Sequence, residues 1–330
     1  MHYTVIDMPK KTLKHHAVKS GKRLGGLLIA ALFVTTVIFA FTRPMLAPGA
    51  DKGNPKVESE IFGLSSGDTF AASSSEDVNP AIGEGVKADS YLIYNEQTGE
   101  VISSRNPDAA VAIASITKLM TAYVTQKYGN LNDTWAISSS NLSDIRPILG
   151  LTPGDKVIVK DLVDAMLIGS ANDSAATLGA YVSSVSKKPI IDLMNKEADA
   201  LGMESTHYEN PIGWDSEQNY STANDLKRLL DVVRPMTLFS EIDRKQSYTF
   251  ISETGKTYSV KATNTLLAQD PEIHAIKTGF TDEAKGAMIT AIHSKDLKFI
   301  IIILGSTDRE GDTKLLKKNV LSKSENIMIQ

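Results

Sequence analysis

The stretch AIASITKLMTA, residues Ala112 to Ala122, contains the most informative residues of this chain. Its apolar residues recur with helical spacing, and Ser115 and Lys118 lie one turn apart among them. Burial of a lysine ammonium group is costly unless a neighbouring group uses it. A serine needs an adjacent base to act as a nucleophile, and a lysine can be that base when burial or a second cation lowers its pKa. The pair predicts that Lys118 activates Ser115, although S-x-x-K spacing on its own is common.

A second polar cluster, GSANDSA over residues 169–175, stands between two predicted helices. A non-helical junction exposes side chains that a helix interior would turn away, so Ser170 and Asn172 are candidate site residues. The competing interpretation is helix capping, because serine, asparagine and aspartate are favoured at N-caps. The motif alone favours capping, and the two interpretations are compatible.

A third cluster, Lys277-Thr278-Gly279, lies in the apolar segment HAIKTGFT of residues 274–281. Lys277 would supply the second cation that lowers the pKa of Lys118. Gly279 would let the backbone of an extended substrate approach the edge of a strand closely. The alternative is an edge-strand lysine that prevents aggregation.

The composition excludes several classes of function. The 330 residues are 42% hydrophobic and 22% charged, which suits one large domain or two modest ones. The net charge of −4 gives no basic footprint, so nucleic acid is not an expected partner. The absence of cysteine excludes disulfides and a cysteine nucleophile. The six histidines lack H-x-H or H-E-x-x-H spacing, so we expect no metal site and no zinc-dependent peptidase.

The N-terminal part predicts a membrane anchor. Residues 24–41 carry no charge and would span about 27 Å as a helix, close to the thickness of a bilayer. Basic residues precede this run, so we expect residues 1–23 in the cytoplasm and the rest of the chain outside the cell membrane. A cleaved signal peptide is the alternative, but the apolar run is longer than a usual signal sequence.

Residues 42–86 are rich in Gly, Pro and Ser and predict a flexible linker. The linker contains a G-x-S-x-G match at Gly63–Gly67. We interpret it as accidental, because no predicted strand precedes it and no predicted helix follows it.

Residues 87–330 predict the folded part. Residues 91–104 alternate around a glycine like a β-hairpin, and helical patterns follow, one capped by Asp161 and one ended by Gly202. From residue 247 the period changes to two, and the last two strands are expected to be adjacent and antiparallel, before a C-terminal helix. The early hairpin and the late strands must then share a sheet, which is an α+β layout with a helical insertion.

These three motifs occur together in penicillin-binding proteins and serine β-lactamases. Further blocks extend the resemblance from about Lys87 to the C-terminus: ASITKLMT, GSANDSA, LMNKEADALGMESTHYENPIGWD, STANDLKRLL and IKTGFT. In this order they resemble the D-alanyl-D-alanine carboxypeptidases of the low-molecular-mass penicillin-binding protein class. The resemblance implies a serine β-lactamase/penicillin-binding-protein-like fold, with an antiparallel sheet flanked by helices and a helical subdomain.

The resemblance also implies a function and a set of roles. Ser115 would be acylated by the penultimate D-Ala carbonyl of a peptidoglycan stem peptide, the terminal D-Ala would leave, and water would hydrolyse the acyl-enzyme. No cofactor is implied, and β-lactams would be covalent inhibitors. The remaining roles are proton acceptor for Lys118, proton relay for Ser170, substrate binding for Asn172, Lys277, Thr278 and Gly279, and an oxyanion hole formed by the backbone N–H groups of Ser115 and Phe280.

The motifs are also compatible with two other classes of protein. A class A β-lactamase would be expected to carry S-D-N and an E-x-x-L-N loop, whereas this chain has S-A-N at residues 170–172 and no such loop before Lys277. A non-catalytic wall-binding domain that binds penicillin is another alternative. His274 departs from the family pattern, and we interpret it as surface variation. Carboxypeptidase and endopeptidase preferences are not separated.

Overall fold

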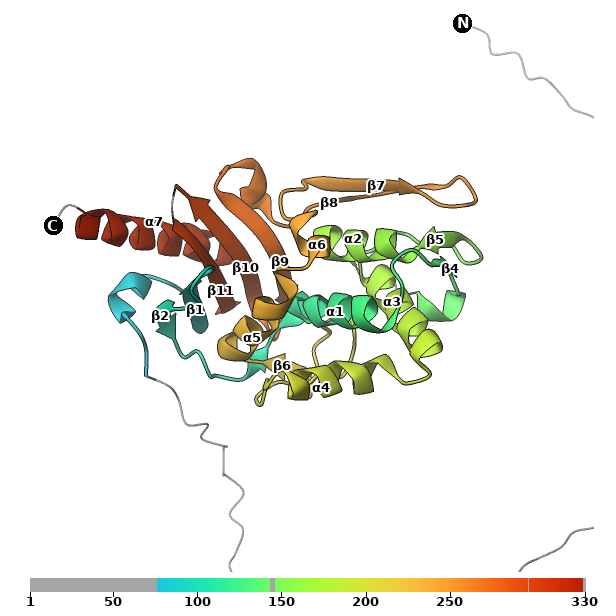
Figure 1. The fold of residues 1–330 in the computed structure, drawn as a ribbon, viewed down its shortest axis with the longest axis horizontal. Coiled ribbons are helices and arrows are strands. Elements are labelled where there is room, and N and C mark those ends of the chain that lie inside the picture. Colours follow the sequence, from blue (N-terminus) through green and yellow to red (C-terminus); the bar gives the residue numbers. More distant parts are fainter. Residues whose placement is uncertain (1–75, 143–145, 296, 329–330) are drawn as a thin grey trace, which may run out of the picture. The chain divides into compact units, whose positions relative to one another are not determined.

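The computed structural model describes residues 76–142, 146–295 and 297–328. Its centre is a sheet in the order β2-β1-β11-β10-β9, in which every neighbouring pair is antiparallel (Figure 1). The early hairpin joins the late strands because β1 pairs with β11, as the α+β prediction required. The strands of this sheet are β1 (Ser90–Asn95), β2 (Val101–Arg105), β9 (Ile273–Thr281), β10 (Lys285–Ser294) and β11 (Leu297–Ser306).

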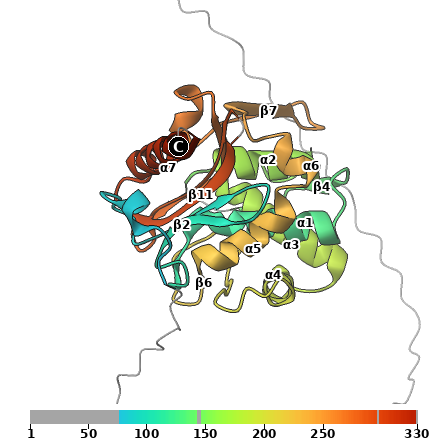
Figure 2. The same ribbon diagram turned by 60° about the vertical axis from the view of Figure 1, so that its left-hand side comes forward.

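Helices cover both faces of the sheet (Figure 2). One face packs against α7 (Arg309–Met328) and the 3-10 turn η1 (Pro80–Gly83), and the other packs against α5 (Ala223–Val233). Residues 299–304 of β11 read FIIIIL, and all six are buried. Successive side chains of a strand point to opposite faces, so this one apolar run contributes to two separate cores.

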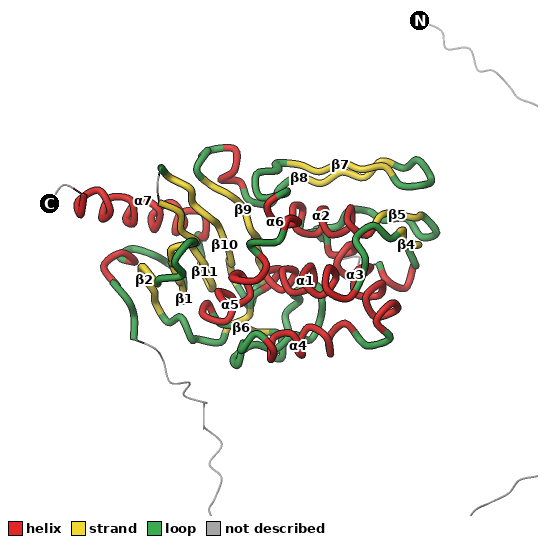
Figure 3. The backbone as a smooth tube through the Cα atoms, in the orientation of Figure 1, coloured by secondary structure: helices red, strands yellow, loops and turns green. Residues whose placement is uncertain are grey.

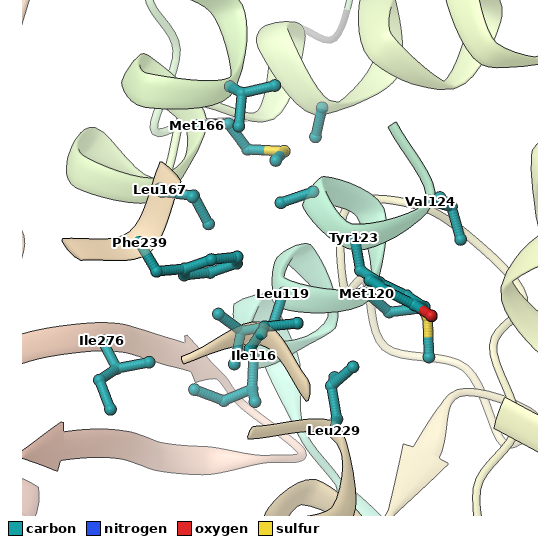
Figure 4. Packing of buried hydrophobic residues seen from close by; sticks show 14 of the residues in the cluster. Ile116, Leu119, Met120, Tyr123, Val124, Met166, Leu167, Leu229, Phe239 and Ile276 are labelled. Carbon is teal, nitrogen blue, oxygen red and sulfur yellow. The ribbon is translucent and has the colours of Figure 1, made fainter. Parts of the chain in front are cut away.

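The helical insertion forms the other half of the domain (Figure 3). Its helices are α1 (Lys118–Tyr128), α2 (Val159–Gly169), α3 (Asn172–Ser186) and α4 (Ile190–Ala200), with the short α6 (Thr237–Ser240) beside them. Apolar side chains from the 3-10 turn over Ala114–Thr117 and from α1, α2, α5, α6 and β9 meet around α1 in one core (Figure 4): Ile116, Leu119, Met120, Tyr123, Val124, Met166, Leu167, Leu229, Phe239 and Ile276. This core holds the start of α1 against the sheet.

Short elements complete the described part of the chain. Three two-stranded ribbons pair β3 (Val111–Ala112) with β6 (Tyr220–Ser221), β4 (Thr134–Ala136) with β5 (Lys156–Ile158), and β7 (Ser247–Ile251) with β8 (Thr257–Lys261). The remaining 3-10 turns are η2 (Ala114–Thr117), η3 (Ser139–Asn141) and η4 (Thr265–Ala268).

Most predicted boundaries agree with the structure, with two corrections. The hairpin over residues 91–104 is confirmed, and Gly202 follows α4 with a φ of +69°, a left-handed conformation that favours glycine. The predicted capping role of Asp161 is wrong, because α2 begins after Ile158 and Asp161 instead accepts a 2.6 Å hydrogen bond from the Tyr248 hydroxyl. The helix expected over residues 112–122 begins only at Lys118, after the turn η2.

The predicted linker extends into the described residues. Within its last part, η1 buries Ile82, and Val86 packs into the same core as Leu316 of α7. Packed residues of the described chain therefore precede Lys87, the predicted start of the folded part. The predicted anchor at residues 24–41 and the G-x-S-x-G match lie outside the described residues. Within the part that is described, no helix is both long and apolar enough to cross a bilayer.

Candidate active site

Ser115 lies in η2, immediately before α1. Ala114 has a φ of +47°, so the backbone turns sharply just ahead of the serine. This turn leaves Ser115 half-buried while Lys118, the first residue of α1, is fully buried. Lys118 Nζ lies 2.8 Å from Ser115 Oγ. The predicted serine–lysine pair is thus in hydrogen-bond contact.

Lys118 Nζ has two further acceptors, Asn172 Oδ1 at 2.8 Å and the backbone oxygen of Ile212 at 2.5 Å. None of its three partners carries a negative charge. Burial is the main cause that holds the Lys118 pKa well below its ordinary value, and the nearby charge of Lys277 lowers it further. A buried lysine with neutral partners and a second cation nearby is poised to accept a proton.

The segment of residues 169–175 brings both of its candidate side chains to the site. Ser170 ends α2 in the left-handed region, with a φ of +58°, and its Oγ accepts a 2.8 Å hydrogen bond from Lys277 Nζ. Asn172 begins α3 and contacts Lys118. The capping interpretation is wrong for this segment, because the N-cap of α3 is Ala171 and no side chain caps the helix.

Asp173, next to Asn172, supports the rim of the site. Its carboxylate accepts hydrogen bonds from the backbone N–H groups of Leu149, Gly150 and Leu151, at 2.9, 2.8 and 3.1 Å. The backbone N–H of Asn172 also donates to the oxygen of Pro147 at 2.8 Å. These bonds tie the start of α3 to the loop that borders the nucleophile.

Lys277 lies on β9, the last strand of the sheet, yet only 2% of its surface is exposed. The interpretation as a solvated edge-strand lysine is therefore wrong. Its Nζ donates to Ser170 Oγ and, at 2.7 Å, to the backbone oxygen of Thr278. Burial, and then the charge of Arg309, lowers the pKa of Lys277 to about 7. The hydroxyls of Thr278 and Thr263 lie 2.5 Å apart.

Gly279 allows β9 to pack directly against the nucleophile turn. A Cβ at this position would lie 3.0 Å from both the backbone nitrogen of Ser115 and the Cβ of Ala114. The sequence predicts that this glycine leaves space for a substrate backbone. The space is instead filled by η2, so glycine is needed for the approach of two protein segments.

A cavity of about 380 Å³ opens beside the nucleophile. Its walls come from η2, the start of α3, the end of β9 and two loops: Ser115, Arg146, Pro147, Asn172, Ile212, Gly213, Trp214, Asp215, Phe280, Thr281 and Asp282. Phe280 is 67% exposed at this wall. Ser115 and Phe280 line the same cavity, and the pairing of their N–H groups as an oxyanion hole stays a prediction.

Sequence reasoning missed two contributors. The loop over residues 209–215 supplies the Ile212 oxygen to Lys118, and a backbone acceptor has no signature in residue types. Arg309, at the start of α7, donates to the backbone oxygen of Gly279 at 2.5 Å. Arg309 is distant in sequence from every motif, so only the packing of α7 on the sheet reveals it. Among the described residues, no group of three or more His, Cys, Asp or Glu is arranged to hold a metal ion.

His274 is not a surface variation. It is half-buried, its Nδ1 lies 2.9 Å from an Asp243 carboxylate oxygen, and its ring centroid lies 4.1 Å from that of His293. His293 in turn lies 2.6 Å from a carboxylate oxygen of Glu96. Burial lowers the pKa of His274 below its ordinary value, and repulsion from His293 adds to this despite the hydrogen bond to Asp243.

Comparisons with known proteins agree with this geometry. The chain is 25% identical over 237 residues to the D-alanyl-D-alanine carboxypeptidase DacF of Bacillus subtilis, a match that covers 70% of this chain and 61% of that protein. It is 34% identical over 219 residues to a D-alanyl-D-alanine endopeptidase of Pseudomonas aeruginosa, covering 64% of this chain and 70% of that protein. The chain thus spans about six tenths of the length of the Bacillus relative.

The crystal structure of the Streptomyces K15 DD-transpeptidase is similar to this chain, with a TM-score of 0.64 and 26% identity over 72% of this chain and 98% of that one. This similarity confirms the predicted penicillin-binding-protein-like fold. The family model for D-alanyl-D-alanine carboxypeptidases, peptidase S11, matches residues 75–308, which include all three motifs. With its motifs gathered around one serine–lysine pair, the chain belongs to the D-alanyl-D-alanine carboxypeptidase family.

Proposed function

We propose that this chain is a serine-type D-alanyl-D-alanine carboxypeptidase that removes the terminal D-Ala from peptidoglycan stem pentapeptides. The observation that carries the proposal is the 2.8 Å contact between Ser115 Oγ and Lys118 Nζ at a cavity. Burial disfavours the charged form of this lysine and lowers its pKa, which favours its role as the base that takes the serine proton.

In the proposed reaction, Lys118 accepts the proton of the Ser115 hydroxyl as Oγ bonds to the carbonyl carbon of the penultimate D-Ala. The backbone N–H groups of Ser115 and Phe280 would stabilise the resulting oxyanion, each donor contributing on the order of 3 kcal/mol. The C–N bond then breaks, and Ser170 relays a proton to the departing amine of the terminal D-Ala. Water hydrolyses the ester on Ser115 and regenerates the enzyme.

The charges on one side of Ser115 support recognition of a terminal carboxylate. Lys277 and Thr278 lie on β9 beside Ser170, and Arg309 contacts the backbone of the same strand at Gly279. Arg309 is paired with Glu310 at 3.0 Å, whereas among the described residues no ion pair joins Lys277 to a carboxylate. The Lys277 ammonium group therefore favours an anionic group, and the Thr278 hydroxyl offers a donor to it. A substrate that ends in a free carboxylate fits this arrangement.

β-Lactams would acylate Ser115 and persist. Rapid hydrolysis of such an adduct requires a base that activates water on the acyl-enzyme. The cavity walls contain two acidic residues, Asp215 and Asp282, and among the described lining residues there is no glutamate. This supports a penicillin-inhibited enzyme over a β-lactamase. A second candidate activity is endopeptidase cleavage of cross-links, favoured by the 34% identity to the Pseudomonas aeruginosa endopeptidase.

Intact mass of the protein with benzylpenicillin, beside Ser115→Ala, tests the nucleophile. We expect one adduct that lasts for minutes on the parent protein and none on the variant. A transient adduct with consumption of penicillin would indicate a β-lactamase, and no adduct on a folded parent protein would leave only a binding role. Chromatography of products from a pentapeptide and from a cross-linked dimer separates the carboxypeptidase from the endopeptidase.

The proposal also places the enzyme at the outer face of the bacterial cell membrane, anchored by residues 24–41. The support is the uncharged run itself and the basic residues that precede it. Alkaline carbonate extraction of cell membranes tests this point. The full chain should stay in the membrane fraction, and a chain of lower mass released from the membrane would indicate cleavage instead.

A further inference from the structure

Within the loop over residues 209–215, between α4 and β6, one side chain binds three successive backbone N–H groups. Asn210 Oδ1 accepts hydrogen bonds from the backbone N–H groups of Ile212, Gly213 and Trp214, at 3.2, 2.7 and 3.0 Å. Asn210 Nδ2 donates to the backbone oxygen of Trp214 at 3.4 Å. Asparagine is suited to this use, because its short carboxamide reaches backbone N–H groups a few residues ahead. Without Asn210, these N–H groups lose their common acceptor.

The folded loop is pressed against the nucleophile turn and α1. Gly213 has a φ of +88°, and a Cβ there would lie 1.9 Å from the backbone oxygen of Ala114, the residue before Ser115. Thr121 Oγ1 donates to the backbone oxygen of Pro211 at 2.7 Å. The loop therefore has little freedom to shift relative to η2 while Asn210 holds its shape.

This placement directs the Ile212 oxygen to Lys118 Nζ at 2.5 Å. A neutral amine has two N–H bonds and one lone pair. The Ile212 oxygen is an obligatory acceptor, and the Asn172 Oδ1 atom accepts as well, so together they use both N–H bonds. The lone pair that remains then points toward the third neighbour, Ser115 Oγ, whose proton it must take.

We propose that Asn210 is a positioning residue for the reaction, which acts through the Ile212 oxygen to orient the Lys118 amine toward Ser115. The inference rests on the proposed function, because it assigns Lys118 the role of base. Asn210 itself touches neither the nucleophile nor the lysine in any of its hydrogen bonds. Its loss would change both the direction of the lone pair and the exclusion of water from Lys118.

Two variants and one control test this role in the full-length protein. The measurement is the rate of acylation by benzylpenicillin as a function of pH. Asn210→Ala removes every hydrogen bond that the Asn210 side chain makes to the loop, and we expect a rate lower by at least about tenfold on the high-pH plateau. We also expect its acidic limb at higher pH, since hydration of Lys118 raises its pKa. Asn210→Ser keeps a weaker acceptor and should have an intermediate rate.

Asn195→Ala is the matched control. Asn195 on α4 makes the same kind of bonds to the chain just ahead of the loop, with Nδ2 donating to the Tyr208 oxygen and Oδ1 accepting from the Tyr208 N–H, both at 2.8 Å. Asn195→Ala should lose stability while its acylation rate stays within about twofold of that of the parent protein. The acidic limb of its pH profile should lie at the same pH as in the parent protein. A purely structural role for Asn210 would give this same result.

The outcomes separate the two proposals. An unacylated parent protein sinks the proposed function. A parent protein that is acylated, with Asn210→Ala folded and acylated at an unchanged rate with an unchanged limb, overturns the positioning role alone. If Asn210→Ala does not fold, Asn210→Ser provides the test. Acylation of Asn210→Ser at the parent rate, with the acidic limb of the pH profile unchanged, would equally contradict the positioning role of Asn210.

Discussion

Lys277 Nζ lies 2.8 Å from Ser170 Oγ, which joins the last strand of the sheet to the junction of α2 and α3. Both lysines of the site are buried, and each has its pKa lowered first by burial and then by another cation. The site therefore carries less positive charge near neutral pH than its residue types indicate.

Protonation of Lys277 should control the binding of an anionic substrate. Its pKa is lowered to about 7, so the cation is lost as the pH rises through that value. On the Ser115→Ala background, the Kd of a D-Ala-D-Ala peptide should rise above about pH 7, by up to about tenfold per pH unit. Calorimetry from pH 6, about one unit below this pKa, to pH 9, about two units above it, measures this pH dependence of the Kd. Lys277→Ala should bind roughly 10- to 100-fold more weakly at the lowest pH, the value of a charge-assisted hydrogen bond. A Kd that does not change with pH would refute the role of this cation.

Lys118 should make folding stability rise with pH. Its pKa in the native state lies well below 10.5, so the unfolded chain binds more protons throughout the interval between the two values. The free energy of unfolding contributed by Lys118 then increases with pH across that interval. Urea unfolding of the parent protein and of Lys118→Met, at two pH values below 10.5, compares their slopes. We expect the stability advantage of Lys118→Met to shrink as pH rises, and a constant difference would mean that Lys118 stays charged in the native state.

Gly279→Ala should separate β9 from the nucleophile turn. The added Cβ meets the Ser115 nitrogen and the Ala114 Cβ at 3.0 Å, and such overpacking costs about 1–3 kcal/mol. We expect lower stability together with slower acylation by benzylpenicillin.

Gly129→Ala serves as the control for this substitution. Gly129 follows the far end of α1, where an added Cβ would lie 2.5 Å from the Tyr181 ring. It should lose stability by a similar mechanism and keep its acylation rate per folded molecule. Equal rates for the two folded variants would show that the packing at Gly279 does not position Ser115.

His274 should reduce stability under mildly acidic conditions. Its native pKa lies below the ordinary value of 6.5, so the unfolded chain takes up the proton first as the pH falls. Stability is therefore highest above about 6.5 and decreases as the pH falls toward the lowered native pKa. His274→Gln should flatten this decrease in the thermal unfolding temperature. An equally steep decrease in His274→Gln would assign the effect to other groups.

Much of the site was predictable because its chemistry is carried by side chains in short segments. Ser115 and Lys118 are three residues apart, and a lysine among apolar residues signals a use for its amine. The same reasoning singled out Lys277 as a lysine in an apolar segment, whereas Ser170 and Asn172 were singled out as polar residues at a non-helical junction between two predicted helices. Asp161 and His274 were misjudged because their partners, Tyr248 and a second histidine, come from distant segments.

The sequence by itself determined the elements, the α+β class and the residue types of the reaction, since periodicity and local motifs are properties of neighbouring residues. Only the tertiary structure decided how the lysine amines are held. The Ile212 oxygen, the Asn210 turn beneath it and Arg309 behind Gly279 all act through backbone groups or long-range packing. Backbone donors and acceptors are the same in every residue type apart from proline, so their position is defined only once the chain has folded around them.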